Sequence, residues 1–200
     1  MKQGRIIIIS GPSGVGKGTV LREVMRRKPE LQFSVSATTR PIRPSETDGV
    51  NYHFMSKEAF EKLIAEDGLL EHVTYADNYY GTPEKPIDEA NARGISVVLE
   101  IEVQGALKVL EKRPDAISIF IAPPSYAELE NRLVGRGDTA PEIMKERLRI
   151  ARWECENAEK YQYIVINDTV ESAADQVVSI LTAEACRAEY QTNILSEEEK

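Results

Sequence analysis

The sequence near the N-terminus reads Ile6-Ile7-Ile8-Ile9-Ser10-Gly11-Pro12-Ser13-Gly14-Val15-Gly16-Lys17-Gly18-Thr19. The apolar run is typical of a strand buried on both faces, and an amphipathic stretch begins at Val20. Glycines between them let the backbone curl, so that successive N–H groups converge on a polyphosphate and the helix N-terminus adds partial positive charge. Lys17 can reach the β and γ phosphates. The loop therefore predicts a nucleoside triphosphate as ligand.

The loop departs from the pattern G-x-x-x-x-G-K-[ST] at its last position. Gly18 stands where the pattern has a hydroxyl that touches magnesium, and Thr19 carries a hydroxyl one residue later. The alternative interpretation is a glycine-rich turn that serves packing alone. The order of strand, loop, lysine and helix favours phosphate binding.

Composition limits the class of protein. The chain's 200 residues can form one large α/β domain or a domain with inserted subdomains, and a chain with 42% hydrophobic and 29% charged residues is typical of a soluble globular protein. Its formal net charge of -8 argues against a broad polyanion-binding surface, so no nucleic-acid partner is expected. Phosphate chemistry must therefore rest on a local cluster of arginines.

Cysteine and histidine usage indicates neither a disulfide framework nor a metal site. Cys155 and Cys186 are too few and too far apart for either a framework or a CxxC motif, which favours a reduced cytosolic setting. His53 and His72 are isolated and are expected to be structural. No signal peptide and no membrane span of about 20 apolar residues is found. We expect a cytoplasmic protein without a membrane partner, and the sequence leaves homo-oligomerisation open.

Strand and helix patterns alternate along the chain. Strands are predicted at 5–10, 95–102, 116–122 and 163–167, and helices at 19–28, 104–112, 125–134 and 170–190. A capping box is predicted at Ser125 and Glu128. This alternation predicts right-handed crossovers and a doubly wound parallel sheet flanked by helices, the α/β fold of P-loop proteins.

Two segments do not follow this alternation. Residues 32–82 contain short strand-like pieces around one helix, which predicts a small inserted α+β subdomain. Residues 135–161 are charged and open on glycines, with Thr139 and Glu142 spaced as a helix start; they predict either a helical lid over phosphates or a solvent-exposed helical hairpin. The remaining core would comprise 1–31, 83–134 and 162–190, and 191–200 would be a solvated tail.

A second phosphate site is predicted around two arginines. Arg40 and Arg43 follow the hydroxyl-rich run 34–39, and Pro41 and Pro44 stiffen the backbone beside them. Arginines on a stiff backbone lose less conformational entropy when their guanidinium groups bind a phosphate. The alternative is a surface turn, but beside a triphosphate loop the pair indicates a phosphate acceptor.

Carboxylates are predicted at one edge of the sheet. Glu100 and Glu102 are two residues apart on the predicted strand 95–102, hence on the same side at its carboxyl end, where ligands of open α/β sheets gather. Glu100 is placed to hold magnesium or its waters. The alternative is a charged strand end that merges into a loop.

Glu71 adds another carboxylate to the predicted inserted subdomain. Guanine presents two adjacent donors that one carboxylate accepts together, whereas adenine presents an acceptor at N1, so a carboxylate pocket prefers guanine. For Tyr79 and Tyr80 alone, core or turn packing is the simpler interpretation.

Three further arginines are candidates to neutralise a transferring phosphoryl group. Arg132 and Arg136 are four residues apart at the end of a predicted helix, and Arg147 lies on the next. The alternative is a surface salt-bridge ladder with nearby glutamates at positions 128, 130 and 146.

Together these pieces resemble the guanylate kinase family. The likeness runs in order from about Gly4 to at least Asp168 and is carried by these segments: the phosphate loop, 36–43, 51–52, Glu71, 78–81, 99–102 with 104–105, 121–125, 132–137 and 165–168. The resemblance implies a P-loop core, an inserted nucleoside-monophosphate subdomain, a lid, and magnesium-dependent transfer of phosphate from ATP to GMP or dGMP.

The resemblance also implies roles for single residues. The GMP phosphate would be bound by Arg40, Arg43, Tyr52 and Tyr80. Guanine would be read by Ser36, Glu71, Thr82 and Glu102. ATP phosphates would be held by Lys17 with the loop Gly11–Thr19, the transition state would be stabilised by Arg132, Arg136 and Arg147, and Asn167 would lie near adenine.

Two departures from the family bear on magnesium and on the base pocket. Glu100 and Glu102 stand where many relatives have aspartate, and Gly18 replaces the usual hydroxyl. Thr19 and Glu100 are therefore the candidate Mg²⁺ ligands, directly or through water, with phosphates and waters supplying the rest.

Two other functions remain open at the level of sequence. One is a guanylate-kinase-like interaction module that grips a protein ligand. Lys17, the loop glycines and the lid arginines argue against it, because a scaffold has no chemical need for them. The other is a related nucleotide kinase with a different acceptor.

Overall fold

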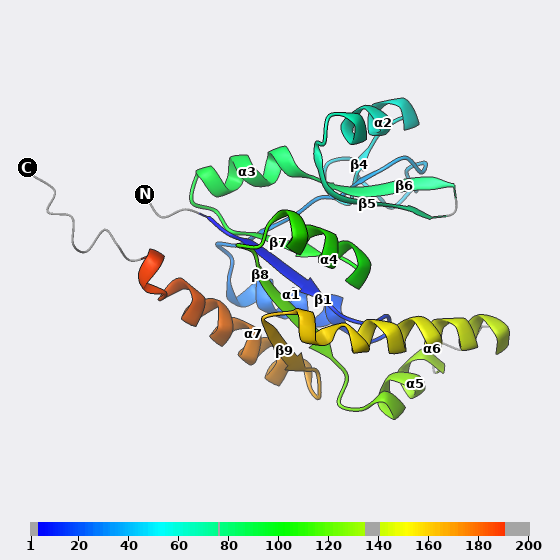
Figure 1. Cartoon of the computed structure of the whole chain (residues 1–200), viewed down its shortest axis with the longest axis vertical. Coiled ribbons are helices and arrows are strands. Elements are labelled where there is room, and N and C mark those ends of the chain that lie inside the picture. Colours follow the sequence, from blue (N-terminus) through cyan, green and yellow to red (C-terminus); the bar gives the residue numbers. More distant parts are fainter. Residues whose placement is uncertain (1–3, 76, 135–140, 191–200) are drawn as a thin grey trace, which may run out of the picture. The chain divides into compact units, whose positions relative to one another are not determined.

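The computed structural model describes residues 4–75, 77–134 and 141–190 (Figure 1). The chain divides into two compact units. The loop unit contains Gly11–Glu30 and the described chain from Ile119 onward, and the two-sheet unit contains Gly4–Ser10 and Leu31–Ser118. The predicted division into a core, a subdomain at 32–82 and a lid at 135–161 follows other boundaries and stays a prediction.

In the first sheet, the two-sheet unit contributes three parallel strands that lie side by side in the order β2-β7-β1. They are β1 (Ile6–Ser10), β2 (Gln32–Phe33) and β7 (Val97–Glu100). Every residue of β1 is buried, as expected for a strand covered on both faces. Helix α3 (Glu84–Ala92) packs against β7, and α4 (Val103–Lys112) packs against β1.

Four short strands form the second sheet, in the order β4-β3-β6-β5. They are β3 (Ala37–Thr38), β4 (His53–Phe54), β5 (Leu69–Tyr75) and β6 (Asn78–Pro83). Helix α2 (Lys57–Ala65) begins at Ser56, whose Oγ accepts from the Ala59 N–H at 3.2 Å. Phe60 on α2 is fully buried and stacks on Tyr79 at 5.3 Å between ring centroids, so the predicted packing of Tyr79 is confirmed.

The loop unit contains a parallel strand pair and most of the helices. The pair is β8 (Ile117–Ala122), whose first two residues belong to the two-sheet unit, and β9 (Tyr163–Ile166). The helices are α1 (Lys17–Arg27), α5 (Tyr126–Val134), α6 (Pro141–Glu156), η1 (Ala158–Lys160), α7 (Val170–Ala185) and η2 (Ala188–Tyr190). Helix α1 contacts α7, whose buried apolar residues are Ala173, Ala174, Val177 and Leu181.

The predicted strands and helices are all present, but several of their ends move. Helix α1 begins two residues earlier than predicted, at Lys17. Strand β7 ends at Glu100 and Glu102 is the N-cap residue of α4, so the prediction that both carboxylates share a strand face is wrong. Residues 32–33 of the predicted subdomain pair with β7 in the parallel sheet.

Helix α3 was not predicted from the sequence. It has nine residues, of which Ile87 and Ala90 are the buried apolar ones, and Pro86 lies in its first turn. Proline is tolerated there because the first-turn N–H groups have no partner within the helix. The predicted capping at Ser125 is confirmed, since its Oγ accepts from the Glu128 N–H at 3.1 Å. The helix start predicted at Thr139 lies outside the described residues.

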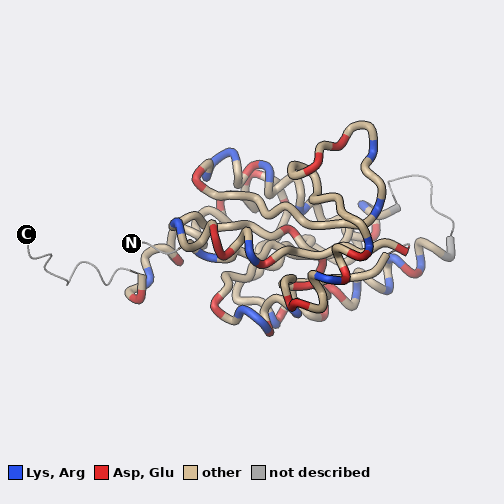
Figure 2. The backbone as a smooth tube through the Cα atoms, turned by 90° about the horizontal axis from the view of Figure 1, so that it is seen from above, with Lys and Arg blue, Asp and Glu red and all other residues tan. Residues whose placement is uncertain are grey.

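Charged residues of both signs are interspersed along the described chain (Figure 2). Among the described residues, no helix combines the length and apolar character that crossing a bilayer requires.

The N-cap of α7 offers a stability test. Thr169 Oγ1 accepts from the Ser172 N–H at 3.2 Å, so Thr169→Ala removes a cap and should lower the free energy of unfolding by about 1 kcal/mol. Urea unfolding followed by circular dichroism measures the change. Thr182→Ala, an exposed site within the same helix, is the control and should stay within about 0.5 kcal/mol of wild type. Equal stabilities of the two variants would contradict the capping role.

Candidate functional site

The phosphate loop of the loop unit has little room for side chains. A Cβ at Gly11 would lie 2.3 Å from the Ile121 carbonyl oxygen, and a Cβ at Gly16 would lie 2.7 Å from Asn167 Nδ2. Gly16 also has φ of 93°, in the left-handed region that favours glycine. Close packing therefore requires glycine at both positions.

Lys17 and Thr19 lie where the loop passes into α1. Lys17 is the first residue of α1, and its Nζ donates to the Gly11 carbonyl at 3.3 Å, so the side chain folds back over the loop. Thr19 is exposed and its Oγ1 accepts from Arg22 at 3.2 Å. The structure thus places the ammonium beside the loop, as the sequence predicts, and leaves the predicted magnesium role of Thr19 a prediction.

The loop is supported by side chains from distant segments. Val15 presents its carbonyl to Asn167 Nδ2 at 2.7 Å and to Arg132 Nη1 at 3.3 Å. Arg132 also donates to the Asn167 carbonyl at 3.4 Å. Asn167, which was predicted to lie near adenine, is buried and forms hydrogen bonds with Val15 and Arg132. A position near adenine stays a prediction.

The three candidate lid arginines differ in their surroundings. Arg132 is half-buried and pairs with Glu128 at 2.8 Å, four residues earlier on α5. Arg147 is exposed on α6, and Glu146 pairs with Arg149 at 2.6 Å. Arg136 lies outside the described residues. The salt-bridge alternative is thus present for Arg132, in addition to its contacts with the loop.

The two-sheet unit brings Glu71 and Thr82 together. They lie opposite each other on the antiparallel strands β5 and β6, and Thr82 Oγ1 donates to Glu71 Oε1 at 2.7 Å. Both residues are buried. The carboxylate also abuts the first turn of α4, because a Cβ at Gly105 would lie 3.0 Å from Glu71 Oε2.

The cost of burying the Glu71 carboxylate is only partly offset by its neighbours. Burial raises the pKa of the Glu71 carboxyl, while the Thr82 hydrogen bond and the charge of Lys108 act to lower that pKa. A buried carboxylate with one neutral donor retains acceptor capacity for a ligand. The structure therefore joins two of the residues that the resemblance assigns to guanine by a direct hydrogen bond, and their role in reading a base stays a prediction.

The other predicted base-reading residues lie on neighbouring segments. Ser36 is half-buried directly before β3, and its carbonyl accepts from the His53 N–H at 2.8 Å. Glu102 is exposed at the N-cap of α4, the helix whose first turn contacts Glu71. Negative charge is favourable at a helix N-terminus. Glu100, the candidate magnesium ligand, is half-buried at the end of β7.

Arg40 is held by a partner that the sequence analysis did not single out. Its Nη1 and Nη2 donate to the two carboxylate oxygens of Glu46 at 2.7 Å and 2.5 Å, and Glu46 also accepts from the Arg43 N–H at 2.9 Å. These donors, Arg40 foremost, lower the pKa of Glu46 to about 2, and the pairing raises the pKa of Arg40.

Aromatic rings complete the surroundings of Arg40. Its guanidinium lies over Tyr52 at 5.1 Å and over Phe54 at 5.4 Å from the ring centroids. Tyr80 meets Tyr52 edge-on at 6.1 Å. The structure therefore groups Arg40, Tyr52 and Tyr80, three of the residues predicted to bind the acceptor phosphate. The Arg43 side chain, the fourth, is exposed.

Two signals in the sequence could have revealed the missed contacts. Gly105 lies inside α4, where glycine costs about 1 kcal/mol relative to alanine, so its presence indicates a close neighbour. Glu46 is an acid within six residues of two arginines in a proline-stiffened loop.

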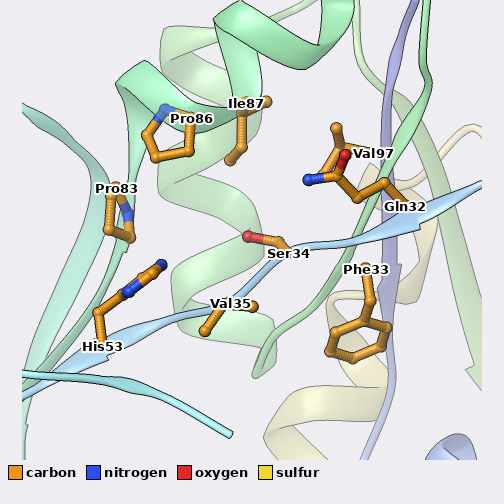
Figure 3. A pocket seen from close by; sticks show the side chains of 9 residues that line it. All are labelled: Gln32, Phe33, Ser34, Val35, His53, Pro83, Pro86, Ile87 and Val97. Atoms are coloured by element: carbon orange, nitrogen blue, oxygen red, sulfur yellow. The ribbon is translucent and has the colours of Figure 1, made fainter. Parts of the chain in front are cut away.

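A separate small pocket lies in the two-sheet unit (Figure 3). Ser34 points into the space that the other labelled side chains surround. The walls of the pocket come from β2 and the two residues after it, from β4, and from the segment that leads into α3. Val97 on β7 completes the lining. No residue predicted to bind nucleotide lines this pocket.

Comparison with known proteins gives a consistent result. The family model described as guanylate kinase matches residues 3–184. A guanylate kinase of Halalkalibacterium halodurans is 49% identical over 94% of this chain and 92% of its own length, and one of Thermus thermophilus is 49% identical over 93% and 84%.

A solved structure is similar as well. The crystal structure of guanylate kinase from Anaplasma phagocytophilum aligns with a TM-score of 0.73 and 32% identity, covering 94% of this chain and 89% of that chain. This match confirms the predicted α/β fold with a parallel sheet flanked by helices. Because the family model matches residues 3–184 of the 200 in this chain, the chain belongs to the guanylate kinase family.

Proposed function

We propose that the chain transfers the γ-phosphoryl group of ATP to GMP, and to dGMP, giving ADP and GDP or dGDP. Family membership supports the reaction, and the observation that carries the choice of acceptor is the buried Glu71 carboxylate with Thr82 at 2.7 Å. That carboxylate accepts from guanine N1–H and the exocyclic amine together. Adenine presents an acceptor at N1, which would leave the carboxylate unpaired.

The donor nucleotide binds at the phosphate loop. The loop N–H groups and Lys17 hold the ATP phosphates, while Arg132, Arg136 and Arg147 neutralise charge that spreads over the transferring group. The acceptor phosphate binds at Arg40, with the tyrosine pair and Arg43.

Magnesium accompanies ATP in this proposal. Mg²⁺ prefers oxygen ligands, and the chain offers the Thr19 hydroxyl and the Glu100 carboxylate, directly or through water. When bound, the ion would neutralise negative charge on the β and γ phosphates.

The reaction needs no covalent intermediate on the protein. A phosphate oxygen of GMP attacks the γ-phosphorus in line, its new P–O bond forms as the bond to the β–γ bridging oxygen breaks, and ADP leaves. The protein's part is to align the two nucleotides and offset their charge.

The test of this function is a coupled assay of ADP release. ATP and Mg²⁺ are supplied with GMP, AMP, CMP or UMP in turn, and GMP should give by far the highest kcat/KM. Equal use of another nucleotide would indicate a different acceptor. Absence of ADP release with every nucleotide would favour an interaction module.

Lys17→Ala tests the donor site. Loss of the ammonium beside the loop should lower kcat by about a hundredfold or more, since a cation at a transferring phosphoryl group contributes several kcal/mol. Lys28→Ala, at the end of the same helix, is the control and should retain wild-type kcat. Wild-type turnover in Lys17→Ala would contradict the assignment.

Glu71→Gln tests base recognition. The amide places a donor against the guanine N–H groups, so KM for GMP should rise about tenfold to a hundredfold while KM for ATP stays near wild type. Burial raises the pKa of Glu71, so this carboxylate takes up a proton at a higher pH than an exposed glutamate does. As the pH is lowered, kcat/KM for GMP should therefore begin to fall at a pH above the pKa of an exposed glutamate. Exposed Glu66→Gln is the control. Unchanged GMP kinetics in Glu71→Gln would rule out this scheme.

Glu46→Gln tests the pairing that orients Arg40. The pKa of Glu46 in the folded protein, about 2, lies below its usual value of 4.5. The ionised Glu46 therefore stabilises the folded state above pH 4.5, and this stabilisation is lost as the pH falls toward 2. The wild type should therefore lose more stability between pH 5 and pH 3 than the variant, measured by urea unfolding at each pH. Identical pH profiles would show that the pair does not stabilise the fold.

A further inference from the structure

Glu154 is a buried carboxylate to which the proposed chemistry gives no role. It lies on α6, it is 4% exposed, and its Oε2 accepts from the backbone N–H of Ser13 at 3.3 Å. Burial of a carboxylate is unfavourable unless polar groups compensate it. One of those groups is the backbone of the phosphate loop, so the contact joins the loop to α6 within one unit.

Glu154 also shares a face of α6 with Arg147. The two are seven residues apart, close to two full turns, which puts them on one side of the helix about 10 Å apart along its axis. Ala151 lies between them on that face and is fully buried. A contact that fixes Glu154 against the loop therefore fixes both the rotation and the axial position of the face that carries Arg147.

We propose that Glu154 is a positioning residue for phosphoryl transfer, which holds the Ser13 end of the phosphate loop and sets the place of Arg147 relative to it. This inference rests on the proposed function, because the loop and Arg147 matter together only in a phosphoryl-transfer enzyme. Glu154 acts through Ser13 and α6. A direct contact with ATP would set two negative charges against each other.

Steady-state kinetics of Glu154→Ala, with either substrate varied, give the first test. Loss of a hydrogen bond to a charged acceptor should lower kcat about tenfold and raise KM for ATP several-fold. KM for GMP should stay within about twofold, because Glu71 and Arg40 belong to the two-sheet unit. Glu156→Gln, exposed on the same helix, is the matched control and should behave as wild type.

Two conservative variants separate positioning from charge. Glu154→Gln keeps the length and an oxygen acceptor, so it should restore most of kcat. Glu154→Asp keeps the charge but withdraws the carboxylate by one methylene, so it should remain impaired. The opposite order, with Asp better than Gln, would overturn positioning in favour of an electrostatic role. These two variants also carry the test if Glu154→Ala does not fold.

Coupling to Arg147 gives the last test. If Glu154 acts through Arg147, the loss in Glu154→Ala/Arg147→Ala should be clearly smaller than the product of the two single losses. Independent, multiplicative losses would overturn the proposal, as would equal rises in both KM values without rescue by Gln.

The wild type measured in the same assay separates this inference from the proposed function. If the wild type releases no ADP with GMP, the function fails. Calorimetric titration of wild type and Glu154→Ala with ATP then tests the loop contact alone, and equal affinities would overturn it.

Discussion

The phosphate loop is held in shape largely by contacts from other segments of the chain. At Gly11 and Gly16 the neighbouring atoms leave no space for a Cβ, so side chains elsewhere must fix the backbone there. Three groups do this: Asn167 and Arg132 at the Val15 carbonyl, and Glu154 at the Ser13 N–H. They come from α5, α6 and the residue after β9. The geometry of the loop therefore depends on the folding of the whole loop unit.

The two-sheet unit solves the same problem with charged side chains. Arg40 is fixed by two hydrogen bonds from its guanidinium to Glu46 and by the ring of Tyr52, while Glu71 is fixed by Thr82 and by the first turn of α4. A side chain ordered before the ligand arrives loses less entropy on binding. The unit thus orders one cation and one anion in advance, as the proposed binding of a phosphate and of a guanine edge requires.

Sequence patterns predict what depends on local structure. The strand at Ile6–Ser10, the start of a helix near Lys17 and the cap at Ser125 follow from residue spacing and local composition. The patterns do not predict where a strand ends. Glu102 was therefore predicted to lie on the strand, whereas in the structure it is the N-cap residue of α4. Nor do the patterns predict contacts across long separations, such as Ser13 with Glu154, 141 residues apart. Such contacts depend on the packing of whole helices, to which local spacing carries no direct signal.

The formal net charge of -8 bears on how two anionic nucleotides are accommodated. Long-range attraction cannot supply the binding energy, and Arg40 and Arg132 are each already paired with a glutamate. In the proposed binding mode a phosphate would share such an arginine with its glutamate, so the net Coulombic gain would be smaller than with an unpaired cation. The benefit of the pairs lies instead in fixed direction, because a guanidinium held in place offers its remaining donors without reorganisation. A reaction that depends on alignment in this way is sensitive to displacements of about 1 Å, and residues that touch neither nucleotide then affect the rate through the positions of those that do.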